Sequence, residues 1–274
     1  MSGNPRAEFD EIGSWSQIKL EIIKEYAVAY STILSRQPRL RHYYIDAFAG
    51  RGVHISKATG QFVPGSPLNA LNVQPPFCGY ALIDLDGEKI AALREQIGNR
   101  PDVRLYEGDC NQILIEKVFP NVTFEQYRRA LCLLDPYGLH LKWEVIRTAA
   151  ANRSIDIFLN FPVMDMNRNV LWRYPERVSQ EDVGRMNAFW GDESWRQAAY
   201  TPVATLFGPA EEKASNAQIA EAFRTRLVEV AGFKHVPSPM PMRNSRGAIV
   251  YYLFFASQKP VAENIVEDIF RKNG

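Results

Sequence analysis

The stretch that decides the fold is residues 43–52, which read YYIDAFAGRG. Its first half is aromatic and β-branched, as is typical of a buried strand, and its second half is a glycine-containing turn. Asp46 is the polar residue that ends the apolar run. Glycines at this point let the backbone approach a ligand closely, although any parallel strand can end at such a turn.

Four further apolar segments repeat this form and are expected to be strands: 80–86, 103–109, 130–135 and 155–162. They alternate with helical patterns and are nearly all apolar, which favours a parallel sheet covered on both faces. Polar residues follow the strands at their carboxyl ends, namely Asp46, Asp84, Asp86, Asp109, Asp135 and Asn160. Ligands bind at that edge of open α/β sheets, so the sequence predicts a ligand site there.

The other expected elements follow from apolar periodicity and turn residues. They are an amphipathic helix over 14–35, a polar loop over 53–64, helices over 66–71, 87–97, 215–230 and 261–270, and strands within 233–241 and 248–257. We expect a single domain over 1–274, with a helical N-terminal segment over 1–37 and a helical insertion over 164–213 at the sheet edge.

Composition excludes several classes of protein. Of 274 residues, 46% are hydrophobic, which is enough for a packed core, and the 32 Lys and Arg balance 31 Asp and Glu, so a globally basic nucleic-acid binder is not indicated. The three cysteines and four histidines show no metal-ligand spacing, so we expect reduced thiols and no metal. The polar residues 1–6 lack a signal peptide, and no apolar run approaches the ~20 residues of a membrane span. These features predict a cytoplasmic protein without a membrane partner.

The strand-end acids suit a nucleotide-like ligand. Asp84 can accept two hydrogen bonds from a ribose diol, and Asp109 can accept one from an adenine amino group. Asp86 can serve the same ribose, or it can begin the helix expected at Gly87. A NAD site is disfavoured, because the third fingerprint glycine is absent and the acid comes later than the ~20 residues expected.

Residues 135–138, Asp-Pro-Tyr-Gly, are a candidate for transfer chemistry on an amine. An exocyclic amine has its lone pair delocalised into the base, so it needs acceptors that localise electrons on nitrogen. The Asp135 carboxylate and a backbone carbonyl at Pro136 can do this, and Tyr137 can stack on the base. The alternative is an ordinary strand-to-turn junction, since Asp-Pro-x-Gly is a common turn.

The order of these motifs resembles that of class I S-adenosylmethionine-dependent methyltransferases and, more narrowly, the three-Cys-motif partner (TcmP) family of bacterial and phage proteins. The stretches that carry the resemblance are 44–50, 65–67, 82–86, 108–111 and 134–138, extended by Trp143, 160–162 and 168–169. It implies a Rossmann-like methyltransferase sheet of seven strands, mostly parallel with an antiparallel C-terminal strand. It also implies a partner protein of the radical-S-adenosylmethionine type with a three-cysteine motif.

The resemblance also implies roles for residues, with S-adenosyl-L-methionine as the cofactor. The cofactor-binding residues would be Asp46, Phe48, Ala49, Gly50, Gly52, Asp84, Asp86 and Asp109, and the catalytic residues Asp135, Pro136 and Tyr137. Among the first group, Asp46, Gly50 and Gly52 would cradle the methionine part.

The methyl acceptor is open at this point. Basic residues in 34–60 and 222–246 could track the phosphates of a nucleic-acid substrate, although solvated basic surface is the more common explanation of such runs. We expect methyl transfer to an amino group of a nucleic-acid base. The alternatives are a non-catalytic module that binds the three-cysteine partner, and a nucleotide-binding enzyme of other chemistry.

Overall fold

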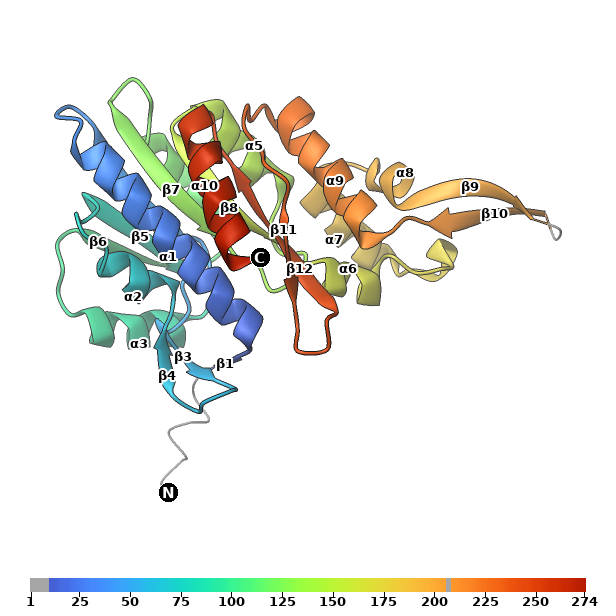
Figure 1. Cartoon of the computed structure of the whole chain (residues 1–274), viewed down its shortest axis with the longest axis horizontal. Coiled ribbons are helices and arrows are strands. Elements are labelled where there is room, and N and C mark those ends of the chain that lie inside the picture. Colours follow the sequence, from blue (N-terminus) through green and yellow to red (C-terminus); the bar gives the residue numbers. More distant parts are fainter. Residues whose placement is uncertain (1–9, 206–207) are drawn as a thin grey trace.

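The computed structural model describes residues 10–205 and 208–274 (Figure 1). The expectation that residues 1–6 lack a signal peptide, and the first part of the N-terminal segment, lie outside the described residues. Within the described ranges, no helix is long and apolar enough to cross a bilayer.

The central sheet has seven strands in the order β11-β12-β8-β7-β2-β5-β6. Their bounds are β2 Arg41–Asp46, β5 Gly79–Asp84, β6 Val103–Glu107, β7 Arg128–Leu134, β8 Ile155–Phe161, β11 Met240–Arg243 and β12 Ile249–Ala256. Strands β7, β2, β5, β6 and β8 are parallel, and β12 lies antiparallel between β8 and β11. This confirms the predicted α/β class and the mostly parallel, methyltransferase-type sheet with its reversed C-terminal strand.

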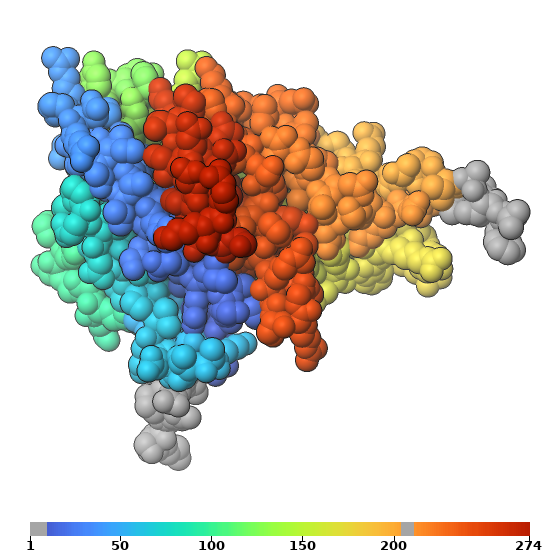
Figure 2. Space-filling view, viewed as in Figure 1, coloured from blue at the N-terminus to red at the C-terminus, as the bar shows by residue number. Residues whose placement is uncertain are grey.

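Helices cover both faces of the sheet. Side chains alternate between the two cores, so that Leu131 and Leu133 of β7 point to one face, and Cys132 and Leu134 to the other. The first face packs against α1 (Ser14–Ser35), α2 (Ser66–Leu71), α3 (Gly87–Ile97) and α10 (Pro260–Asn273). Figure 2 shows α1, in blue, and α10, in red, side by side. The nearly continuous apolar strands follow from burial on both faces.

The second face carries shorter helical pieces. They are α4 (Cys110–Ile113), a π-helical turn η2 (Leu114–Val118), a 3₁₀ turn η3 (Phe119–Asn121), α5 (Trp143–Asn152), α9 (Asn216–Arg226) and a second π-helical turn η5 (Leu227–Ala231). Phe223 of α9 is fully buried and contacts the rings of Trp143, Phe161 and Phe254. The second core is therefore centred on α9 and the sheet.

The segment predicted as a helical insertion is helical only in its first part. It contains α6 (Val163–Asn169), the 3₁₀ turn η4 (Pro175–Arg177), α7 (Gln180–Trp190) and α8 (Trp195–Ala199). It then forms an antiparallel hairpin of β9 (Tyr200–Thr205) and β10 (Gly208–Lys213), which projects from the body of the protein (Figure 1). Thr201 and Val203 favour a strand, and Gly208 and Pro209 disfavour a helix, which explains the difference.

The loop predicted over 53–64 also differs. It forms strands β3 (Val53–Ser56) and β4 (Phe62–Pro64), and β1 (Glu11–Ile12) pairs with β3 in parallel. This small sheet directly follows the glycine turn and holds the beginning of the described chain next to it. The strand expected within 233–241 is likewise shorter and begins only at Met240.

Candidate functional site

A cavity of about 820 Å³ opens at the carboxyl ends of β2, β5, β6 and β7. Its lining includes five of the predicted site residues, namely Phe48, Asp84, Asp86, Asp109 and Tyr137. Six others lie outside its lining, namely Asp46, Ala49, Gly50, Gly52, Asp135 and Pro136. Its volume is within the ~300–1,000 Å³ that is typical of small-molecule sites.

Asp46 is fully buried and braces the turn after β2. Its carboxylate accepts hydrogen bonds from the Phe48 amide at 3.2 Å and from the Tyr44 hydroxyl at 3.4 Å. Burial raises the pKa of Asp46 to about 7. The structure therefore gives Asp46 a role in shaping the turn, and its predicted contact with the cofactor stays a prediction.

The glycines of the turn are required by its shape. Gly50 and Gly52 have φ values of +63° and +82°, which other residues adopt rarely. A Cβ atom at Gly52 would lie 2.7 Å from the Cδ1 atom of Leu93, so the Leu93 side chain would have to shift. The turn thus packs closely against α3 and leaves Phe48 at the cavity wall.

Asp84 joins this turn to the end of β5. Its Oδ2 atom accepts a hydrogen bond from the Gly50 amide at 2.8 Å, and its Oδ1 atom accepts one from the Asp86 amide at 3.0 Å. A carboxylate oxygen can accept a second hydrogen bond, so both oxygens keep acceptor capacity on the cavity side. The exposed side chain of Leu85 adds an apolar surface beside them.

Asp86 and Asp109 are helix N-caps that also line the cavity. Asp86 accepts hydrogen bonds from the amides of Glu88 and Lys89 at 2.9 and 3.4 Å at the start of α3. Asp109 accepts one from the Asn111 amide at 2.9 Å at the start of α4. The capping alternative for Asp86 is therefore realised, and a ligand role is additional to it.

Asn111 is a buried residue of the site that the sequence did not single out by role. Its Nδ2 atom donates to Asp109 at 2.8 Å and to the His140 carbonyl at 2.9 Å, and its Oδ1 atom accepts from the Lys142 amide at 2.7 Å. Asn111 thus fixes the loop after β7 against the end of β6. Leu139 and His140 of this loop form part of the cavity wall.

The insertion supplies a further part of the wall. Glu181, Gly184, Arg185 and Ala188 of α7 line the cavity. A Cβ atom added at Gly184 would meet no atom within 4 Å, so this helix position borders open space. Sequence reasoning did not connect α7 with the strand-end acids, because its helical period does not indicate what the helix faces.

Asp135 forms an ion pair with Lys19 of α1, a residue that the sequence did not single out. Burial by itself lowers the pKa of the Lys19 ammonium, but the Asp135 carboxylate outweighs it and raises the pKa above its usual value. Lys19 therefore remains a cation, and its Nζ atom lies 5.2 Å from the centre of the Tyr251 ring. The ion pair holds the Asp135 side chain against α1.

The rest of the Asp-Pro-Tyr-Gly segment is divided between the interior and the solvent. The Pro136 carbonyl accepts a hydrogen bond from Asn160 Nδ2 at 3.1 Å, while Asn160 Oδ1 is buried without a partner among the described residues. Tyr137 is 72% exposed, and the Lys89 Nζ atom lies 5.7 Å from its ring centre. Tyr137 is thus free to contact a ligand at the cavity.

In the parts of the chain that the structure describes, no three His, Cys, Asp or Glu side chains form a group that could hold a metal ion. Aromatic side chains of the insertion are divided between the interior and the surface. Phe189 and Trp190 are buried in the core, whereas Trp172 and Tyr174 are exposed.

Comparison with known proteins shows similarity at the level of structure. No family model and no curated protein matches the sequence. A solved protein from Legionella pneumophila has a TM-score of 0.49 at 10% identity, covering 91% of both chains. S-adenosylmethionine-dependent methyltransferases from Mesorhizobium loti and Leishmania major have TM-scores of 0.38 and 0.39 at 11% and 9% identity. The alignment with the first enzyme covers 84% of this chain and 97% of the enzyme. The alignment with the second covers 88% of this chain and 82% of the enzyme. Because these scores are low, the fold assignment rests on the strand order of this chain.

The raised pKa of Asp46 predicts a pH-dependent stability. The native carboxyl keeps its proton up to about pH 7, whereas an unfolded one loses it near 3.8, so folding binds a proton between these values. Stability from this group therefore falls as pH rises through that window. Replacement of Asp46 by Asn removes this decrease in the free energy of unfolding, which amounts to up to about 4 kcal/mol between the two pKa values.

Urea unfolding of the wild type and the Asp46→Asn variant at about pH 4 and about pH 8 measures this effect. We expect the variant to gain stability relative to the wild type at the higher pH. The exposed Asp268, replaced by Asn, serves as the control and should show no such trend. A difference between wild type and Asp46→Asn that is the same at both pH values contradicts the assignment.

Proposed function

We propose that the protein is an S-adenosylmethionine-dependent methyltransferase that acts on an exocyclic amino group of a nucleic-acid base. One observation carries the proposal. Acids at the ends of two adjacent strands, Asp84 on β5 and Asp109 after β6, border one cavity beside the glycine turn of β2. Asp135 follows β7, the strand on the other side of β2.

The residues present fit the cofactor. Asp84 has acceptor capacity for the two ribose hydroxyls, and Asp109 has an oxygen without a partner among the described residues for the adenine amino group. Leu85 offers the adenine an apolar surface, and the turn at Phe48 approaches from β2. When bound, the cofactor supplies an electrophilic methyl group on a sulfonium.

The chain's own contribution to transfer is to orient the acceptor. The Asp135 carboxylate can accept a hydrogen bond from the target amine and so localise the lone pair on nitrogen. Lys19 holds this carboxylate in place, and Asn160 holds the Pro136 carbonyl. Tyr137 is exposed and can stack on the base at the cavity rim. The basic residues near β2 would attract the phosphates of the substrate.

The second candidate is a non-catalytic module of the three-Cys-motif partner family. A specific observation favours it, since Lys19 already engages Asp135 and Asn160 already engages the Pro136 carbonyl. A target amine would have to share both acceptors with these groups. In this case the cofactor cavity would serve the association with the radical-S-adenosylmethionine-type partner. Methyl transfer by the protein alone distinguishes the two candidates.

Calorimetric titration with S-adenosylmethionine tests the cavity through a matched pair of variants. The Asp84→Asn variant loses the negative charge and one acceptor oxygen, and it sets its amide N–H against either the Gly50 or the Asp86 backbone amide. A hydrogen bond to a charged group contributes about 1.5–3 kcal/mol, so affinity should fall at least about tenfold. The Asp268→Asn variant makes the same chemical change at an exposed position outside the cavity lining. Its affinity should stay within about threefold of wild type. Equal loss in both variants, or no binding by the folded wild type, contradicts the proposal.

Radiolabelled methyl transfer to single-stranded DNA and RNA tests the role of Asp135. The Asp135→Asn variant removes the carboxylate that orients the amine, so turnover should fall by at least about 100-fold. Cofactor affinity should change little, because Asp135 does not line the cavity. The control is Lys24→Met, which changes an exposed cation on the same helix as Lys19 and should leave turnover unchanged.

Loss of cofactor affinity in Asp135→Asn that equals its loss of turnover would show a structural role instead. Cofactor binding by the wild type without transfer to any acceptor would favour the non-catalytic module. Addition of the three-cysteine partner would then be the next condition to measure.

A further inference from the structure

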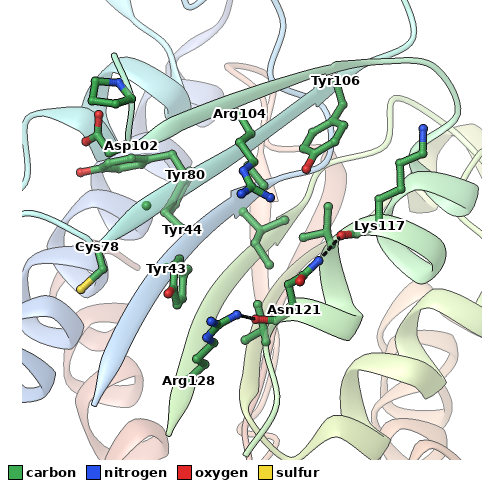
Figure 3. Close-up of a pocket in the computed structure, with 16 residues that line it drawn as sticks. Tyr43, Tyr44, Cys78, Tyr80, Asp102, Arg104, Tyr106, Lys117, Asn121 and Arg128 are labelled. Atoms are coloured by element: carbon green, nitrogen blue, oxygen red, sulfur yellow. Dashed lines mark hydrogen bonds between the residues drawn. The ribbon is translucent and has the colours of Figure 1, made fainter. Parts of the chain in front are cut away.

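A second hollow, of about 320 Å³, lies toward the amino ends of the strands, whereas the candidate functional site lies at their carboxyl ends (Figure 3). Its lining includes Gly79 and Arg128, which begin β5 and β7, and Asp102, which precedes β6. The active-site cavity is lined instead by residues that follow the strands. The two cavities share no lining residue.

Small residues on β5 create this hollow. Gly79 is paired with Tyr43 of β2, and Ala81 is paired with Arg104 of β6, so short side chains lie between long ones. A Cβ atom at Gly79 would come within 3.2 Å of the Tyr43 ring. Val118, the last residue of the π-helical turn η2, forms part of the wall on this face. The amino-terminal parts of β2, β5 and β6 are therefore left uncovered on this face.

The hollow is cationic. Arg104, Lys117 and Arg128 line it, and none of them has a carboxylate partner in residues 10–205 and 208–274. Asp102 is the acid in its described lining, and it is already paired with Arg100 at 2.7 and 3.1 Å. Three positive side chains thus face the hollow without local compensation, which favours an anionic ligand.

Aromatic side chains stand beside these cations. Figure 3 shows Arg104 and Tyr106 extending from β6, with Tyr43 and Arg128 close together below them. The Arg128 guanidinium lies 6.0 Å from the centre of the Tyr43 ring and donates to the Asn121 carbonyl at 2.8 Å. Tyrosine rings next to arginines suit a ligand that combines a planar base with phosphate.

Charge at the edge of a sheet has another common explanation. Strand β6 is the edge strand, and charged side chains on edge strands prevent pairing with other chains. That role requires neither a hollow nor aromatic walls. Arg104 and Tyr106 are two residues apart and therefore lie on the same face of the strand, directed over the sheet. The arrangement therefore goes beyond what edge protection requires.

We propose that this hollow binds one nucleotide unit. Its phosphate would contact Arg104, Lys117 and Arg128, and its base would lie against Tyr43 and Tyr106. The volume of about 320 Å³ is at the lower end of small-molecule sites, which suits a single nucleotide. A free nucleotide and one nucleotide of a single strand present the same chemistry. This site is independent of the proposed methyl transfer.

Calorimetric titration with uridine 5′-diphosphate, uridine and a short oligothymidine tests the proposal. Pyrimidines are chosen because an adenine nucleotide could enter the active-site cavity. The variant Ala81→Ile fills the floor with a residue that suits strands, and Arg104→Gln with Lys117→Gln removes two charges. The matched control is Lys24→Gln with Arg271→Gln, two exposed cations outside the lining. Circular dichroism confirms that each variant is folded.

We expect the diphosphate to bind the wild type and the control equally, and at least about tenfold more weakly in both hollow variants. Uridine should bind much more weakly than its diphosphate. Tighter binding of the oligothymidine, with a salt slope that falls by about 0.7 for each lost phosphate contact, assigns the site to a single strand. Preference for the diphosphate assigns it to a free nucleotide.

The proposal would be overturned if the folded wild type bound neither the diphosphate nor the oligothymidine, or if affinity were unchanged in both hollow variants. Uridine that binds as tightly as its diphosphate would also overturn it. Because S-adenosylmethionine binding is measured separately, its failure leaves these outcomes readable.

Discussion

The hydrogen bond between the Gly50 amide and the Asp84 carboxylate is the contact on which the candidate site depends. It joins the turn after the first parallel strand to the end of the next one, at the point where a ligand would lie between them. The turn itself requires the positive φ of Gly50, and the buried Asp46 accepts a hydrogen bond from the Phe48 amide in the same turn. The remaining wall of the cavity is built around this fixed pair of strand ends.

In one part of the candidate site the carboxylates are available to a ligand, and in the other part the carboxylate is already held in an ion pair. Around Asp84 and Asp109 the acids keep acceptor capacity and border a cavity that suits a cofactor. At Asp135 the carboxylate is paired with a buried lysine. Breaking such an ion pair without a replacement partner costs free energy of folding. The amino group of a methyl acceptor must therefore donate a hydrogen bond of its own to the Asp135 carboxylate. The same geometry thus explains both leading candidates for the function, a transferase and a partner-binding module.

Much of the fold could be predicted from the sequence because its signals are local. Apolar runs that end at Asp46, Asp84 and Asp109 predict parallel strands and the edge where their carboxyl ends meet. Contacts between distant segments carry no such local signal. Lys19 and Asp135 are 116 residues apart, and no periodicity in α1 marks the lysine as buried. The contribution of α7 to the wall was missed for the same reason. The β9–β10 hairpin, in contrast, is a local structure with local signals in Val203 and Pro209.

The central claim is that the cavity at the carboxyl edge of the sheet holds the cofactor with its ribose on Asp84. A crystal structure of the protein with S-adenosylhomocysteine tests it most directly. The account predicts the ribose diol on the Asp84 carboxylate, the adenine near Asp109 and Leu85, and the sulfur directed toward the side of Asp135. Electron density for the ligand elsewhere, or with its ribose away from Asp84, would contradict it.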